Sequence, residues 1–204
     1  MAINVSAAQV KELRERTGAG MMDCKRALVE ANGEMQQAIE LLREWGIVKA
    51  SKKAGRQAKE GLISAYIHPG GRLGVLIEVN CETDFVANTK EFQEFVKDLA
   101  MQVAAAAPQY VSRDQVPPAV LEHEREVLMA QARNEGRPEN VLQRIVEGRL
   151  EKFYEENCLL DQPFVKESDK KVRQLVQEAV SKFGENIVVR RFARFQLGEG
   201  EEEA

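Results

Sequence analysis

The sequence predicts an α+β fold in which three short helices precede a small antiparallel sheet covered by helices. Three observations carry this prediction. Residues 1–48 contain three segments whose apolar side chains recur at helical spacing. Two alternating apolar segments then flank Pro69-Gly70-Gly71, and a third alternating segment returns near the C-terminus after several helical segments. Strands placed first and last, with helices between them, are typical of an antiparallel sheet whose helices lie on one face.

Residues 1–48 are predicted to form a three-helix domain. Ser6 can cap the first helix, with Gln9 as the reciprocal partner of a capping box. The second and third helices are MMDCKRALVEANG (21–33) and EMQQAIELLREWG (34–46). Helices of this length are marginal in isolation, so we expect them to pack on one another.

Residues 49–60 are predicted to be a linker or a loosely held helix. They contain five basic residues and no apolar stripe of useful width. A basic segment also permits phosphate binding, which leaves RNA contact through 49–59 as an alternative. No aromatic residue is interleaved to stack on bases, and the chain carries a net charge of −4. We therefore expect no direct contact with nucleic acid.

Residues 61–197 are predicted to be the α+β core, followed by an acidic, disordered tail at 198–204. The turn at 69–71 joins two strands, and the second alternates Leu73, Val75, Ile77 and Val79 with more polar residues. The closing strand is expected to turn one apolar face to the core, formed by Ile187, Val189, Ala193, Phe195 and Leu197. Arg191 interrupts this face, and nothing in the sequence explains it.

Four helices are predicted between these strands. Asn88 is expected to cap the first, whose apolar stripe includes Phe92 and Phe95. Pro117-Pro118 and Pro138 should start the next two, because proline is favoured in a first helical turn. Ser168 is expected to cap the last helix, which Gly184 should end.

The residues predict no enzyme, no cofactor and no metal site. The chain lacks nucleophile-elbow, phosphate-loop, dinucleotide and zinc-protease motifs. Its three cysteines (Cys24, Cys81 and Cys158) are far apart and form no metal spacing, which favours a reducing, cytoplasmic setting. Acidic neighbours argue against a reactive Cys81, which we interpret as a small buried residue at a strand end. No apolar segment reaches membrane-spanning length, and the N-terminus lacks a signal-peptide core.

Two groups of residues are candidates for binding a partner. In CETDFVANTKEF (81–92), Phe85 lies outside the helical stripe, on a short segment between two rigid elements. It could return to the core or be held out as a wedge. The adjacent Met21 and Met22 point in different directions on a helix, so at least one should lie at the rim of the small domain. By themselves these features indicate only an interaction protein.

Several ordered motifs resemble the bacterial-type translation elongation factor Ts family. They are VKELRERTGAGMMDCKRALVEANG, EVNCETDFVA, GRPENVLQRIVEGRL, LLDQPFV and GENIVVRRF, and the resemblance spans roughly residues 3–200. It implies a ubiquitin-associated-like helical domain before an α+β core. It also implies a guanine-nucleotide exchange factor that speeds GDP release from the GTPase elongation factor Tu during translation elongation.

The resemblance also assigns roles to residues. Arg14, Met21 and Met22 would contact the nucleotide domain of elongation factor Tu. Thr83, Asp84, Phe85 and Val86 would insert near its nucleotide site and dislodge the bound Mg²⁺.

Longer members of the family carry a duplicated core and a helical-hairpin insertion, whereas this chain resembles the short form. In that form two subunits can pair, which implies a homodimer and a 2:2 complex. The alternative from another class is an adaptor that binds its partner through the helical domain and leaves nucleotide release unchanged.

Overall fold

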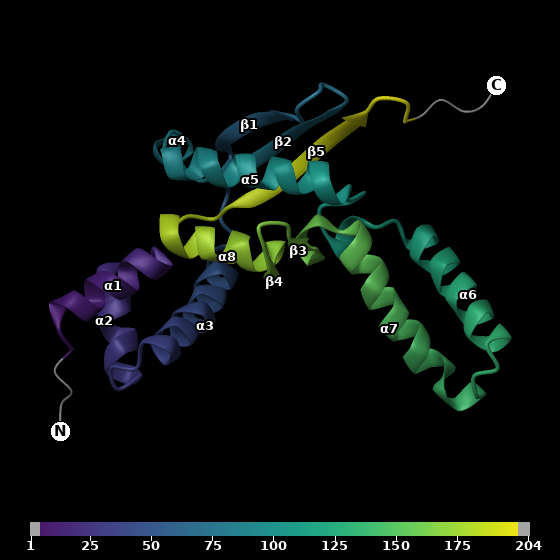
Figure 1. Cartoon of the computed structure of the whole chain (residues 1–204), viewed down its shortest axis with the longest axis horizontal. Helices are drawn as coiled ribbons and strands as arrows, with labels where there is room; N and C mark the ends of the chain where they lie inside the picture. The colour runs from purple at the N-terminus through teal and green to yellow at the C-terminus, as the bar shows by residue number, and fades with distance from the viewer. Residues whose placement is uncertain (1–4, 200–204) are drawn as a thin grey trace. The chain divides into compact units, whose positions relative to one another are not determined.

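The computed structural model describes residues 5–199, which fold into eight α-helices and five strands (Figure 1). The elements are α1 (Ala7–Thr17), α2 (Met21–Glu30), α3 (Met35–Lys53), β1 (Glu60–Ile67), β2 (Leu73–Cys81), α4 (Asp84–Ala87), α5 (Lys90–Ala106), α6 (Pro118–Asn134), α7 (Glu139–Asn157), β3 (Pro163–Phe164), β4 (Glu167–Lys171), α8 (Val172–Phe183) and β5 (Val188–Gln196). The predicted α+β class is confirmed.

The chain divides into two compact units. The first unit contains the residues up to Leu62 together with 80–92 and 174–188. The second unit contains 63–79, 93–173 and the residues from 189 onward. Our division at residues 48 and 60 stays a prediction, and most of the predicted acidic tail (200–204) lies outside the described residues.

In the first unit, α1, α2 and α3 pack around a small apolar core. This core contains Val10, Leu13, Cys24, Ala27, Leu28, Ala31 and Ala38. The predicted capping box is present, since Ser6 accepts from the backbone of Gln9 while the Gln9 side chain accepts from Ser6. Helix α3 continues to Lys53, and the Lys49 Nζ atom lies 2.5 Å from the Asp23 carboxylate. Part of the basic segment is therefore helical.

The second unit contains most of a three-stranded sheet in the order β1-β2-β5. Gly70 and Gly71 have positive φ angles (97° and 67°) in the β1–β2 turn, as the hairpin prediction required. Val75, Ile77 and Val79 on one face of β2 are buried. Helix α5 lies along the sheet (Figure 1) and buries Phe95, Val96, Leu99 and Val103.

The opposite face of the sheet is exposed, and this corrects one prediction. Ile187 and Val189 are buried as expected, but Ala193, Phe195 and Leu197 are exposed. Alternation identifies two faces of a strand without showing how far helices cover either one. Beyond Val189 the predicted apolar face of β5 is uncovered.

The same exposed face explains Arg191. Its Nε atom donates to Glu78 Oε2 at 2.7 Å, so the arginine pairs with a neighbouring strand. A charge at this position does not interrupt a buried face, because the face is open there.

Helices α6 and α7, both predicted from the sequence, form a two-helix hairpin. Leu128, Val146 and Leu150 form its small core, against which Met129 packs. Pro118 begins α6, and Pro138 directly precedes α7, in agreement with the prediction. Gly136 turns the chain between the helices with a φ of 72°.

Two predicted helix caps are wrong. Asn88 ends α4, and the hydroxyl of Thr89 accepts from the Phe92 amide instead at 3.2 Å. Ser168 lies within β4, and α8 begins at Val172. In each case a short element that the apolar pattern did not reveal occupies the expected cap position.

Candidate partner-binding site

The Thr83–Val86 motif lies on α4, a single helical turn between β2 and α5. Thr83 caps this turn with extended backbone angles, and its Oγ1 atom accepts from the Val86 amide at 3.4 Å. Asp84 is exposed in the first turn, where a carboxylate interacts favourably with the helix dipole. Ala87, the last residue of the turn, is buried.

Phe85 points outward, with 82% of its surface exposed. Phe92, seven positions later, is fully buried and meets Phe183 edge-to-face with ring centroids 5.7 Å apart. Of the two roles that the sequence left open for Phe85, burial in the core is therefore excluded. An exposed aromatic on a short, anchored turn is a feature that suits an interface.

The motif is held by Glu185, a residue that the sequence analysis did not identify. Glu185 Oε2 accepts from the backbone amides of Glu82 and Thr83, both at 3.0 Å. Glu185 Oε1 accepts from the Thr83 hydroxyl at 2.6 Å. The two segments are 102 residues apart in sequence, so no local pattern links them. The one available signal was a polar pair, Glu185-Asn186, between a helix stop and a strand.

The segment around Glu82 also holds the segment around Glu185 in return. Glu82 Oε1 accepts from the Asn186 amide at 2.6 Å, and the Asn186 side chain donates to the Arg56 carbonyl at 2.8 Å. The Arg56 guanidinium lies 3.6 Å from Glu82 Oε1. The basic segment therefore supports the base of α4 through its backbone and one of its charges.

Lys53 makes a further contact in this region by donating to the Gly184 carbonyl. Burial lowers the pKa of the Lys53 ammonium, and the nearby positive charge of Arg56 adds to this effect. Lys49, Lys53 and Arg56 each have a partner within the chain, and RNA contact through the basic segment stays an untested alternative.

Cys81 is the buried last residue of β2, as the sequence predicted. Its thiol donates to the Thr83 carbonyl at 3.1 Å, and burial raises its pKa, with Glu185 adding to the effect. A thiol of this kind stays protonated at neutral pH and stabilises the turn into α4.

The second predicted group lies on α1 and α2. Arg14 is exposed in the last turn of α1, and Met21 and Met22 are 45% and 74% exposed at the start of α2. Cys24, Ala27 and Leu28 fill the core, which leaves both methionines outside it. Within residues 5–199, no hydrogen bond or ion pair joins this group to Thr83–Val86.

Across the described part of the chain, no cluster of three or more His, Cys, Asp or Glu side chains is placed to hold a metal ion. None of its helices is both long and apolar enough to cross a membrane.

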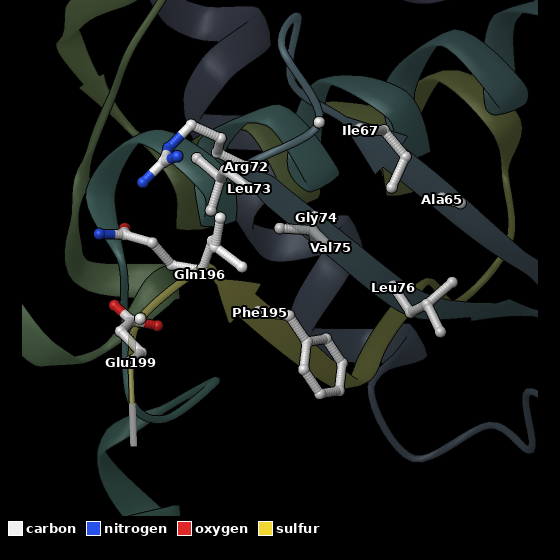
Figure 2. Close-up of a pocket in the computed structure, with 13 residues that line it drawn as sticks. Ala65, Ile67, Arg72, Leu73, Gly74, Val75, Leu76, Phe195, Gln196 and Glu199 are labelled. Atoms are coloured by element: carbon white, nitrogen blue, oxygen red, sulfur yellow. The ribbon is translucent and has the colours of Figure 1, made fainter. Parts of the chain in front are cut away.

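The second unit carries another candidate surface, the exposed side of the sheet. Figure 2 shows Ile67 of β1, Leu76 of β2 and Phe195 of β5, which together line a shallow pocket. All three are exposed, as are Ile63 and Leu197. We call these five residues the open sheet face.

The comparisons with known proteins agree with the motifs. The family model described as elongation factor TS matches residues 2–199. A protein named elongation factor Ts from Thermoanaerobacter sp. (strain X514) is 66% identical over 96% of this chain and 96% of its own length. Proteins of the same name from Caldanaerobacter subterraneus subsp. tengcongensis and Moorella thermoacetica are 65% and 63% identical over 96% of this chain, and over 98% and 97% of their own lengths. The chain therefore belongs to the elongation factor Ts family.

Proposed function

We propose that this chain is a guanine-nucleotide exchange factor for elongation factor Tu and acts in the cytoplasm during translation elongation. It inserts Thr83–Val86 near the nucleotide site of the GTPase and displaces the bound Mg²⁺. The observation that supports this role is Phe85, which is 82% exposed on a turn anchored at its base by Glu185.

Exchange of this kind requires no bond chemistry from the chain. A GTPase holds GDP in part through Mg²⁺, which demands near-ideal octahedral oxygen coordination. A small displacement of the groups around that ion therefore weakens nucleotide binding. Phe85 supplies a rigid apolar wedge, and the exposed Asp84 supplies a negative charge close to the phosphate–Mg²⁺ site.

The coupling between the exchange factor and GDP must be reciprocal. If the factor weakens GDP binding, GDP weakens the binding of the factor by the same ratio. A coupling of about 4 kcal/mol corresponds to roughly a thousandfold change in affinity. One inserted aromatic anchor, at about 2 kcal/mol or more, together with a lost ion is of the right order.

Arg14, Met21 and Met22 form the second contact with elongation factor Tu, on its nucleotide domain. Their exposure supports this assignment. Flexible thioether side chains adapt to a partner surface, so this group contributes affinity while Phe85 acts on the nucleotide site.

We further propose that two copies of the chain pair through the open sheet face to give a 2:2 complex. Ile67, Leu76 and Phe195 are 65%, 49% and 68% exposed on one side of the sheet. Contiguous apolar surface of this kind is typical of interaction sites, and a twofold interface matches the same patch on both subunits. Sedimentation of the free chain should show a dimer that Phe195→Ser converts to a monomer. A wild-type monomer at tens of micromolar would overturn the pairing.

The decisive experiment for exchange measures the release of fluorescently labelled GDP from elongation factor Tu with and without this chain. We expect acceleration that saturates with the concentration of the chain. Binding to the GTPase without any acceleration would refute exchange and favour the adaptor alternative.

A further inference from the structure

One carboxylate holds both the backbone and the side chain of Thr83, the residue that caps α4. Glu185 lies just after Gly184, which ends α8 with a φ of 75°. The Glu82 and Thr83 amides and the Thr83 hydroxyl all donate to its carboxylate, at 3.0, 3.0 and 2.6 Å. Hydrogen bonds to an ionised acceptor are stronger than neutral ones, so this is a firm attachment for so short an element.

Helix α4 needs such an attachment because it has only four residues. An isolated helical turn does not form in water, since its nucleation is unfavourable. Its orientation must therefore come from the groups at its ends. Ala87 is buried at the C-terminal end of the turn, and the Thr83 cap holds its N-terminal end.

The Thr83 hydroxyl links Glu185 to the helix. A hydroxyl has one proton to donate and lone pairs with which to accept. Because the proton points to Glu185 Oε1, the oxygen remains free to accept the Val86 amide. The charge on Glu185 therefore sets the direction of the hydroxyl and, through it, the cap of the turn that carries Phe85.

We propose that Glu185 is a positioning residue for nucleotide exchange, which fixes α4 in the orientation that presents Phe85 to the GTPase. This inference rests on the proposed function. Glu185 acts through Thr83 and is not itself a contact residue for the partner. Its loss should lower the maximal rate of GDP release and leave the half-saturating concentration nearly unchanged, because Arg14, Met21 and Met22 still dock.

The first test compares Glu185→Gln with Glu147→Gln, the same chemical change at an exposed position on α7. Glutamine has the size of glutamate, but its amide nitrogen replaces one of the two acceptor oxygens and cannot accept from the donors that face it. We expect the maximal release rate to fall at least tenfold for Glu185→Gln, or about 1.4 kcal/mol, with half-saturation within twofold. The Glu147 control should match the wild type. An unchanged maximal rate, or a raised half-saturation alone, would overturn the proposal.

A double-mutant cycle separates positioning from general destabilisation. If Glu185 acts by orienting Phe85, Glu185→Gln should change the release rate by less than twofold in a Phe85→Ala background. A second tenfold loss in that background would show that the two residues act independently, which is the opposite of what positioning requires.

Amide hydrogen exchange provides a readout without the GTPase. Exchange of the Thr83 and Val86 amides should accelerate at least tenfold in Glu185→Gln, while the Ile77 amide in the central strand stays protected. Wild-type protection at Thr83 and Val86 would overturn the proposal. If the wild-type chain does not accelerate GDP release from elongation factor Tu, the proposed function is refuted. If the wild type accelerates release and Glu185→Gln does so equally well, only the positioning role is refuted.

Discussion

Phe85 and Phe92 allow the exposed aromatic and the core aromatic to be compared within one segment. Truncation of Phe92, which is fully buried against Phe183, should cost about 3–5 kcal/mol of unfolding free energy. For a chain of this size, 1 kcal/mol shifts the melting temperature by about 2–4 °C, so Phe92→Ala should lower it by about 6–20 °C. Phe85 is 82% exposed, and Phe85→Ala should change stability by at most about 0.5 kcal/mol.

Phe85→Ala should have a large effect on the rate of GDP release although its effect on stability is small. An aromatic anchor in an interface contributes about 2 kcal/mol or more, which corresponds to a factor of about 30 in rate. Stopped-flow release of labelled GDP from elongation factor Tu, at saturating concentrations of the chain, should therefore slow about 30-fold for Phe85→Ala.

Calorimetric melting of both variants completes the comparison. Comparable losses of melting temperature for Phe85→Ala and Phe92→Ala would refute the exposed position of Phe85. A stable Phe85→Ala variant with wild-type release would refute the wedge itself while leaving the fold intact.

Three further perturbations test other parts of the molecule. Met22→Asp should raise the half-saturating concentration about tenfold, which corresponds to the loss of one interface contact of about 1.4 kcal/mol. The maximal release rate and the melting temperature should stay unchanged, because Met22 is 74% exposed. A lower melting temperature would contradict this prediction. Asp161→Ala should destabilise the second unit by about 3 kcal/mol in chemical denaturation, since this buried carboxylate accepts from Arg113 and Arg173 at 2.9 and 3.2 Å. A loss of stability under about 0.5 kcal/mol would show that these ion pairs are dispensable. Burial raises the pKa of the Cys158 thiol from 9.0 to about 11, so the unfolded chain loses this proton at a lower pH than the folded chain. The thiol's contribution to the free energy of unfolding, about 2–3 kcal/mol, is therefore present below pH 9 and lost as the pH rises towards 11. Denaturation of the wild type and Cys158→Ala across this range should show a shallower pH dependence for the variant, and equal slopes would argue against the shift.

Features that depend on a local pattern of residues could be predicted from the sequence. The capping box at Ser6, the turn at Gly70-Gly71, and the helix starts at Pro118 and Pro138 all appear as predicted. Each depends on residues within a few positions of one another, so propensity and periodicity suffice to locate it. The motifs along the chain likewise identified the family before the fold was known.

Features that depend on contacts between distant residues became visible only in the folded chain. Alternation marked Phe195 as a residue of an apolar face, but only the packing showed that this face is exposed beyond Val189. The sequence left Phe85 open between core and surface, and its exposure follows from the orientation of α4. That orientation is held by Glu185, 102 residues from Thr83, and no local pattern carries information about a hydrogen bond formed only when the chain folds.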